Sequence, residues 1–210
     1  MGLASPKQYL RLGGLTMLEL TAQALAQDPR IEQIALVVAP DDERWRGLAF
    51  PPQVEVLPVG GASRAESVRN GLACLGLAAS DWVLVHDAAR PCLGRDELAR
   101  LIDTLIDDAV GGLLAVRLAD TLKRGEAGQV VATLDRSGLW RAATPQMFRA
   151  GLLADALAGE IAAITDEASA IEAAGLRPRL VEGEATNIKL TVPADEALAR
   201  AILHLQGRLS

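Results

Sequence analysis

Apolar and polar residues alternate along the chain so that strands and helices are predicted in turn. Residues 34–39 form a continuous apolar run, typical of a strand buried on both faces, and further strands are predicted over 54–59, 82–85, 113–118 and 179–182. Between these strands the apolar spacing predicts helices over about 16–25, 63–76, 96–106, 149–158, 166–174 and 193–206. This alternation indicates an α/β fold with a parallel sheet and helices on both faces.

Local signals support several of the helix ends. Thr16 with Glu19, and Ser63 with Glu66, have the spacing of capping boxes. Gly175 is expected to stop one helix. Proline fits the first position of a helix, so the last helix is expected to begin at Pro193. The first 14 residues show no regular pattern, and 187–191 is expected to be a short extended piece.

The alternation breaks over residues 120–136, which are polar and rich in turn residues. Gly125 and Gly128 flank a turn that precedes a β-like stretch at 129–134. Two extended pieces without an intervening helix indicate a hairpin that leaves the sheet. We therefore expect a single domain over residues 1–210, with a β-arm over 117–140.

Composition narrows the class of protein. The chain has 210 residues, of which 50% are hydrophobic and 23% charged, which suits a globular core. The net charge of -6 argues against nucleic acid as a partner, so a phosphate ligand would need a local cluster of cations. No apolar run is long enough for a membrane span, and no signal segment opens the chain, so we expect no membrane partner and a cytoplasmic protein. Two cysteines and two histidines lack metal-site spacing.

Lysine is rare among the 21 basic residues, which are mostly arginine. It occurs only at Lys7, Lys123 and Lys189. Each is therefore a candidate for a site that needs a compact ammonium group, with chance as the alternative. Lys123 follows the arm's first residues and precedes Arg124, so we interpret it as a solvated charge.

Ligands of parallel sheets bind at the carboxyl ends of the strands, and two such ends carry suggestive residues. Residues 60–64 read Gly-Gly-Ala-Ser-Arg, which is either an anion site at a helix start or an ordinary turn with a cap. Asp87 closes another strand and is either a ligand for a sugar hydroxyl or metal, or a cap paired to Arg90. Phosphate-loop, dinucleotide and hydrolase motifs are absent from the sequence.

Six short motifs occur in order along the chain: Pro-Lys-Gln-Tyr at 6–9, His-Asp-Ala-Ala-Arg-Pro at 86–91, Asp-Thr-Leu-Lys at 120–123, Thr-Pro-Gln at 144–146, Thr-Asp-Glu-Ala at 165–168 and Asn-Ile-Lys at 187–189. Together they closely resemble the 2-C-methyl-D-erythritol 4-phosphate cytidylyltransferase family, over essentially the whole chain. The resemblance implies a Rossmann-like nucleotidyltransferase fold whose β-arm clasps a second subunit in a homodimer. It also implies Mg²⁺-dependent transfer from CTP to a sugar-alcohol phosphate, with release of pyrophosphate.

The resemblance also implies roles for individual residues. Lys7 matches a lysine that stabilises the transition state, and Arg136 and Lys189 match a pair that positions the substrate phosphate. The remaining matched positions are nucleotide contacts at Gly61, Ser67, Asp87, Ala88 and Arg90, and substrate contacts at Thr121 and Thr144. Thr121 and Arg136 would act on the neighbouring subunit's substrate. The family's Mg²⁺ would be held mainly by CTP phosphates, with Asp87 as a candidate ligand.

The start of the chain departs from the family pattern. The family opens with a strand and a glycine-rich phosphate loop, of which only Met1-Gly2 resemble the end. We expect two strands in the middle of the sheet to lack a partner, and the chain to fold poorly or be nearly inactive in this form. Two alternatives follow: ribitol-phosphate cytidylyltransferase activity, or a truncated non-catalytic relative that binds nucleotide or only dimerises.

Other residues are interpreted without a role in the chemistry. Asp166 is expected to be a first-turn charge that complements a helix dipole. Trp140 is expected to pack beside the arm rather than stack on a base, and Cys74 and Cys92 to be inert.

Overall fold

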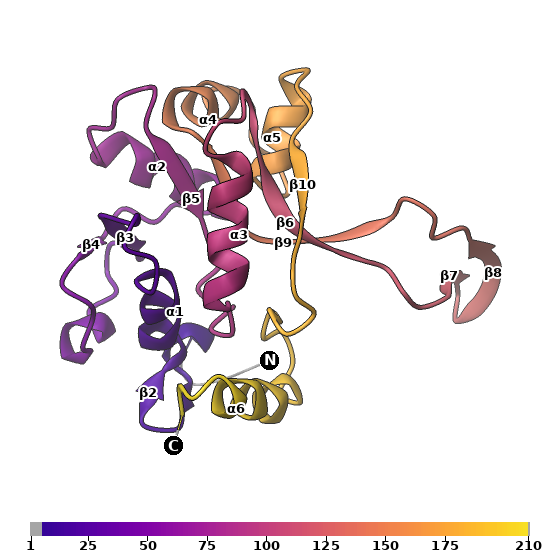
Figure 1. The fold of residues 1–210 in the computed structure, drawn as a ribbon, viewed down its shortest axis with the longest axis horizontal. Helices are drawn as coiled ribbons and strands as arrows, with labels where there is room; N and C mark the ends of the chain where they lie inside the picture. Colours follow the sequence, from indigo (N-terminus) through magenta and orange to yellow (C-terminus); the bar gives the residue numbers. More distant parts are fainter. Residues whose placement is uncertain (1–5, 210) are drawn as a thin grey trace.

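The computed structural model describes residues 6–209, and its centre is a four-stranded sheet (Figure 1). The strands lie in the order β10 (Arg179–Glu182), β6 (Gly111–Arg117), β9 (Trp140–Arg149) and β5 (Trp82–Val85). Strand β10 is parallel to β6, whereas β9 is antiparallel to both of its neighbours. A separate parallel pair is formed by β3 (Ile34–Val37) and β4 (Val54–Leu57).

The helices begin close to their predicted positions. They are α1 (Met17–Leu25), α2 (Arg64–Cys74), α3 (Arg95–Leu105), α4 (Ala150–Ala156), α5 (Glu167–Ala173) and α6 (Asp195–Leu205). Short elements complete the ends and connections: the 3-10 turns η1 (Lys7–Tyr9) and η2 (Arg44–Gly47), and the paired strands β1 (Arg11–Leu12) and β2 (Leu15–Thr16). Within residues 6–209 no helix is long and apolar enough to cross a membrane.

The helix-start predictions hold to different degrees. The capping box of Thr16 and Glu19 is complete. Ser63 caps α2 by accepting the Glu66 N–H, but the Glu66 carboxylate returns to the backbone of Ala62 instead of Ser63. Pro193 precedes α6 by two residues, so the last helix starts later than predicted.

Strand β9 was not predicted, and it changes the sheet from mostly parallel to mixed. Proline is unfavourable in a central strand because it has no N–H to donate, and Pro145 lies within β9. The pairing explains how it is accommodated. Register with β6 runs from Gly111 to Leu113, shifts, and resumes at Ala115 opposite Ala142, so Pro145 falls in the irregular stretch.

The sheet is covered on both faces, as the alternation of strands and helices predicts. Side chains of β6 alternate between the faces. Leu114 packs in one cluster with Leu101 and Leu105 of α3, and Leu113 packs in another with Leu153 of α4 and Ile171 of α5. A third cluster joins α6 to α1 and β1.

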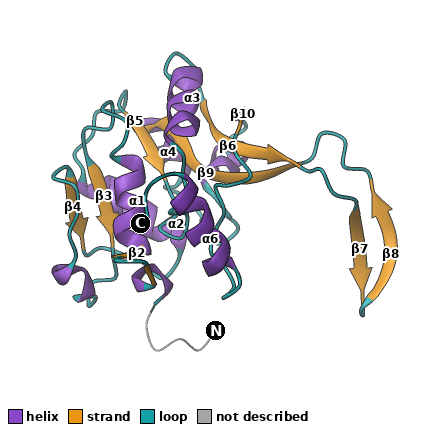
Figure 2. Cartoon of the chain, turned by 60° about the horizontal axis from the view of Figure 1, so that its bottom comes forward, coloured by secondary structure: helices purple, strands orange, loops and turns teal. Residues whose placement is uncertain are grey.

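Within the region predicted as an arm, β7 (Leu122–Glu126) and β8 (Gln129–Leu134) form an antiparallel hairpin that extends well away from the sheets (Figure 2). The turn places Ala127 at φ 48° and Gly128 at φ 81°. Two consecutive positive φ angles match the twist of a two-residue hairpin loop. Val130 and Val131 on β8 are 64% and 50% exposed.

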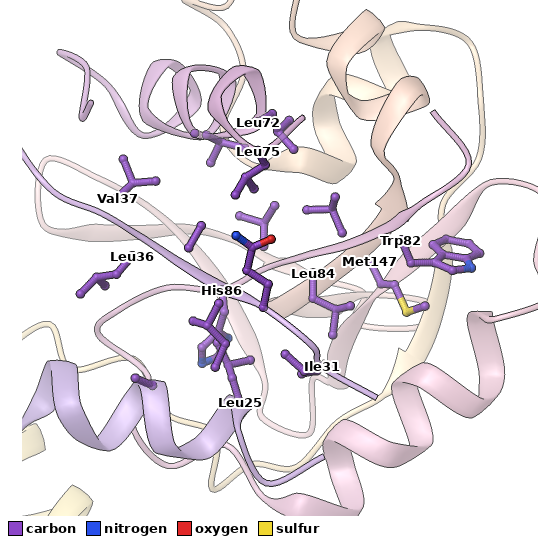
Figure 3. Close-up of a pocket in the computed structure, with 18 of the residues that line it drawn as sticks. Leu25, Ile31, Leu36, Val37, Leu72, Leu75, Trp82, Leu84, His86 and Met147 are labelled. Atoms are coloured by element: carbon purple, nitrogen blue, oxygen red, sulfur yellow. The ribbon is translucent and has the colours of Figure 1, made fainter. Parts of the chain in front are cut away.

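The two sheets face each other across an apolar cavity of about 940 Å³ (Figure 3). Strand β3 pairs only with β4, and β5 pairs only with β9, so in the described residues the edges that face the cavity have no strand partner. Val37 and Leu84 line the cavity from these strands, and Leu72 lines it from α2. Met1 and Gly2, to which the family's glycine-rich loop was compared, lie outside the described residues.

Candidate functional site

Asp87, directly after β5, is the centre of a cluster of charged side chains. Its Oδ1 accepts a hydrogen bond from Arg64 Nε at 3.0 Å. Its Oδ2 lies 3.0 Å from Lys189 Nζ and 3.4 Å from Arg90 Nε. Burial by itself would raise the pKa of Asp87, but the charges of Arg64 and Lys189 lower it to about 2. Asp87 is therefore ionised at neutral pH.

A second carboxylate, that of Glu167, fixes the position of Arg64 in this cluster. Glu167, the first residue of α5, is 1% exposed and binds the guanidinium of Arg64 at two points, with distances of 2.5 and 2.9 Å. Bidentate pairs of this kind fix orientation as well as distance. Arg64 therefore joins the start of α5 to Asp87.

Three cations and two carboxylates leave this cluster with a net positive charge of about one. Lys189 is the most accessible of the cations, because its side chain is 45% exposed. The cluster borders a small pocket of about 130 Å³, lined also by Thr144, Gln146 and Asp166. A local cation cluster that opens to solvent suits an anionic ligand in a chain of overall negative charge.

A chain of hydrogen bonds fixes the backbone at Asp87. The Asp87 N–H donates to Thr144 Oγ1 at 3.1 Å, and Thr144 Oγ1 lies 2.9 Å from His86 Nδ1. His86 Nε2 lies 3.1 Å from the Arg90 carbonyl oxygen, which can only accept. All three bonds are satisfied when His86 is neutral with its proton on Nε2. Burial lowers the pKa of His86 to about 4, which keeps the ring in this state at neutral pH.

The turn before α2 does not present free N–H groups as an anion site would. Gly61 N donates to Ser67 Oγ at 3.0 Å, and Ala62 N donates to Glu66 Oε2 at 2.8 Å. In this structure the N–H groups of Gly61 and Ala62 are therefore used within the turn, and a nucleotide contact by Gly61 stays a prediction. Gly60 is required here because a Cβ on it would lie 2.8 Å from the carbonyl oxygen of Val38.

Three other predicted site residues, Lys7, Thr121 and Arg136, lie apart from the Asp87 cluster, whereas Ala88 directly follows Asp87. Lys7 Nζ donates to the Thr191 carbonyl at 2.6 Å, two residues beyond Lys189. Arg136 is exposed at the base of the arm and donates to the Ala119 carbonyl, and Thr121 is exposed nearby. The Ala88 carbonyl accepts from the Thr21 hydroxyl.

The residues interpreted without a chemical role have ordinary contacts. Asp166 caps α5 by accepting the Ser169 N–H. Arg117 stacks over the Trp140 ring at 4.1 Å. Lys123 is exposed and donates to Thr133 across the arm. Cys92 is buried, and burial raises the pKa of its thiol to about 11, which is consistent with an inert cysteine.

Arg64 and Glu167 are the functional candidates that sequence reasoning missed. Arg64 appeared only as the last residue of the turn, and Glu167 only as part of a motif. An acidic residue in the first turn of a helix is normally a solvated charge that favours the helix dipole. Its burial depends on α5 packing against the turn before α2, which no local pattern reveals.

The described residues 6–209 contain no group of three or more acidic, histidine or cysteine side chains that could hold a metal. Asp87 is the one carboxylate that borders the small pocket together with Lys189 and is not a helix cap. Magnesium sites commonly use one or two carboxylates and complete their shell with ligand phosphates and water. The donor set therefore fits a magnesium ion brought by a phosphate ligand, not one held by the protein alone.

Comparison with known protein families gives one match over nearly the whole chain. The model of the 2-C-methyl-D-erythritol 4-phosphate cytidylyltransferase family matches residues 1–205. A relative with that name from Laribacter hongkongensis is 58% identical over 211 residues, covering 99% of this chain and 92% of the relative. Another from Neisseria gonorrhoeae is 51% identical over 210 residues, covering 97% and 91%.

Solved structures give the same answer for the fold. A crystal structure of 4-diphosphocytidyl-2C-methyl-D-erythritol synthase has a TM-score of 0.88 at 49% identity, with 94% of each chain covered. The 2-C-methyl-D-erythritol 4-phosphate cytidylyltransferase of Thermus thermophilus has a TM-score of 0.81 at 32% identity, covering 96% of this chain and 95% of that one. These matches give no support to the expectation that the chain folds poorly or is nearly inactive.

Proposed function

The chain belongs to the 2-C-methyl-D-erythritol 4-phosphate cytidylyltransferase family, and from this premise we propose that it joins CTP and 2-C-methyl-D-erythritol 4-phosphate. The products are 4-diphosphocytidyl-2-C-methyl-D-erythritol and pyrophosphate. The observation that carries the proposal is the Asp87 cluster, in which Lys189 is held at the mouth of a phosphate-sized pocket.

The reaction is an in-line displacement at the α-phosphorus of CTP. An oxygen of the acceptor phosphate forms a bond to that phosphorus, and the bond to the bridging oxygen breaks. The electron pair leaves with pyrophosphate. The nucleophile is already an anion, so the enzyme needs positioning and charge neutralisation more than a general base.

The side chains around Asp87 suit this requirement. His86 is neutral and both of its ring nitrogens are engaged, so it orients Thr144 and Asp87 instead of accepting a proton. Lys189 supplies positive charge to the acceptor phosphate, and Arg90 contacts the nucleotide. Asp87 holds those cations in place and offers a carboxylate to the ribose.

The remaining roles follow from the family. Lys7 stabilises the charge that develops on the α-phosphate, and Gly61 and Ser67 contact the nucleotide. Thr121 and Arg136 lie at the base of the arm, and they act on the substrate of a second subunit in a homodimer clasped by β7 and β8. The exposed Val130 and Val131 would gain cover in that dimer. CTP is a metabolite of the cytoplasm, so the proposal includes a cytoplasmic location.

Magnesium completes the proposal as a cofactor that arrives with CTP. Asp87 is the side chain that would face it, and the other ligands would be phosphate oxygens and water. When bound, the ion neutralises charge on the CTP phosphates.

Pyrophosphate release tests the function. The purified chain is assayed with CTP and Mg²⁺ and either 2-C-methyl-D-erythritol 4-phosphate or ribitol 5-phosphate, with and without EDTA. We expect turnover with the methylerythritol phosphate and its loss on chelation. Turnover with ribitol phosphate alone would identify the protein as a ribitol-phosphate cytidylyltransferase. No turnover with either acceptor would favour the non-catalytic alternative.

A further inference from the structure

A buried carboxyl group lies behind the site and has no cation to neutralise it. Glu97, in the first turn of α3, is 1% exposed. In the part of the chain that the structure describes, no ion pair involves this side chain. A charged carboxylate in such a place is unfavourable, because burial removes water and no cation pairs with the charge.

The contacts of Glu97 leave two oxygen atoms unsatisfied. Its Oε1 accepts the Glu184 N–H at 2.7 Å and lies 3.4 Å from Asn187 Nδ2. Its Oε2 and the Oδ1 of Asn187 are both buried without a hydrogen-bond partner. Two acceptors cannot satisfy each other, but a single proton on Oε2 turns that atom into a donor.

We propose that Glu97 is held as a neutral acid that donates its proton to Asn187 Oδ1, and that this acid–amide pair positions the catalytic side chains in front of it. One proton then satisfies both orphaned oxygens. Burial also raises the pKa of Glu97, and the charge of Glu184 acts in the same direction, against hydrogen bonds from the Glu184 and Gly94 backbones and from Asn187. The charge of Glu97 acts on Arg90, but the Arg90 guanidinium donates to Asp87 and to the Asn187 carbonyl and forms no ion pair with Glu97.

The pair positions the site through Asn187. The side chain of Asn187 donates from Nδ2 to the Thr144 carbonyl at 2.9 Å, and its own carbonyl accepts from Arg90 Nη1 at 2.7 Å. Lys189 follows two residues later and contacts Asp87. Glu97 therefore orients Thr144, Arg90 and Lys189 together without touching a ligand. This kinetic part rests on the proposed function, whereas the protonation state does not.

The protonation state is tested by carbon-13 NMR of protein labelled at glutamate side-chain carboxyl carbons. The Glu97 signal is identified by its absence from the spectrum of Glu97→Gln. We expect the Glu97 signal to stay at the position of the neutral acid through pH 4 to 7. Titration of the Glu97 signal near the ordinary glutamate pKa of about 4.3 overturns the proposal.

Stability gives a second readout that does not depend on activity. A group with a raised pKa in the folded state contributes most below its unfolded pKa, and the contribution falls as pH rises toward the folded value. Glutamine at position 97 can donate a hydrogen bond to Asn187 but cannot ionise, so its contribution to stability does not fall as the pH rises. The Tm of Glu97→Gln minus that of wild type should therefore increase from pH 4 to pH 8. A constant difference contradicts a neutral Glu97.

The positioning role is tested by kinetics of Glu97→Ala and Glu97→Gln. We expect Glu97→Ala to raise the KM for the acceptor phosphate about tenfold and that for CTP far less, and Glu97→Gln to recover most of the loss. Equal losses in both variants would mean that the ionised carboxylate is needed. If Glu97→Ala does not fold, the glutamine variant and the NMR titration still decide the protonation state.

Discussion

The two sides of the cavity differ in how firmly their strands are held. On one side, β6 and β9 each pair with strands on both edges, and five consecutive residues of β6 are buried. On the other side, β3 and β4 pair only with each other, and three of the four β3 residues are half-buried. Asp87, Thr144 and Lys189 extend from the first side, whereas Gly61 and Ser67 extend from the second.

This difference indicates that one side of the cavity is rigid and the other more adjustable. The first side carries a network that engages the side chains of Asp87, Thr144 and His86, so its geometry is fixed before a ligand arrives. The second side is joined to it mainly through α1, α2 and apolar contacts around the cavity. Under the proposed function, ligand groups that contact Asp87 and Thr144 therefore meet a rigid surface, whereas those that contact Gly61 and Ser67 meet a more adjustable one. Arg64, at the start of α2, bridges the two.

The largest effect is expected on the rigid side, from Lys189→Ala. Removing one preorganised charge at the reacting phosphate should lower kcat/KM by about 10²–10³. Because the side chain is 45% exposed, the Tm should change little. Steady-state pyrophosphate release and thermal unfolding measure both, with Lys123→Ala on the arm as the matched control. A loss below about tenfold would remove Lys189 from the catalytic group.

The next effect concerns the stability of the same side at low pH. His86 has a folded pKa of about 4, below its ordinary value of 6.5. The unfolded chain therefore binds this proton first, and stability is present above pH 6.5 and lost as pH falls to 4. The shift corresponds to at most about 3 kcal/mol.

Urea unfolding at pH 7 and pH 4.5 measures that loss. In His86→Gln the difference between the two pH values should shrink, whereas His204→Gln, on the exposed last turn of α6, should behave like wild type. An unchanged difference in His86→Gln would mean that other groups account for the loss.

A smaller effect is expected where the two sides are bridged. Glu167→Gln weakens the bidentate hold on Arg64 and removes a charge-assisted hydrogen bond, which contributes about 1.5–3 kcal/mol. The expected result is a fall of roughly 10- to 100-fold in kcat/KM for CTP. Glu172→Gln, on the exposed face of α5, is the control. Equal kinetics in both variants would show that the bridge has no role.

Hydrogen exchange compares the two sides directly and should give the smallest differences. Amides of β3 and β4 should exchange at least about tenfold faster than those of β6 and β9, since fewer buried contacts oppose local opening. Adding CTP should slow exchange in β4 and α2 and leave β6 unchanged. Uniform exchange rates without ligand would contradict the division between the sides.

The sequence predicted correctly those elements that are determined by residues close together in the chain. The helix at Thr16, the hairpin after Thr121 and the strand before His86 are encoded by caps, turns and apolar runs. It failed where distant segments decide the outcome. Strand β9 was not predicted, and Pro145 within it is accommodated by the register shift opposite β6, which no local pattern reveals.

In the candidate site, too, the sequence predicted the residues within motifs but not those whose burial depends on distant segments. Asp87, Arg90, Thr144 and Lys189 were named from motifs, and the structure brings them together. Glu97 and Glu167 occur in helix first turns, where acidic residues are usually exposed, so nothing in the pattern reveals their burial.

The most direct test of the central claim follows the oxygen atoms of the acceptor. 2-C-methyl-D-erythritol 4-phosphate carrying oxygen-18 in its phosphate is incubated with the protein, CTP and Mg²⁺, and the products are analysed by mass spectrometry. The account predicts that all label appears in the cytidyl diphosphate product and none in pyrophosphate, because the acceptor phosphate attacks the α-phosphorus. Label in pyrophosphate, or release of unlabelled CMP without a labelled product, would contradict it.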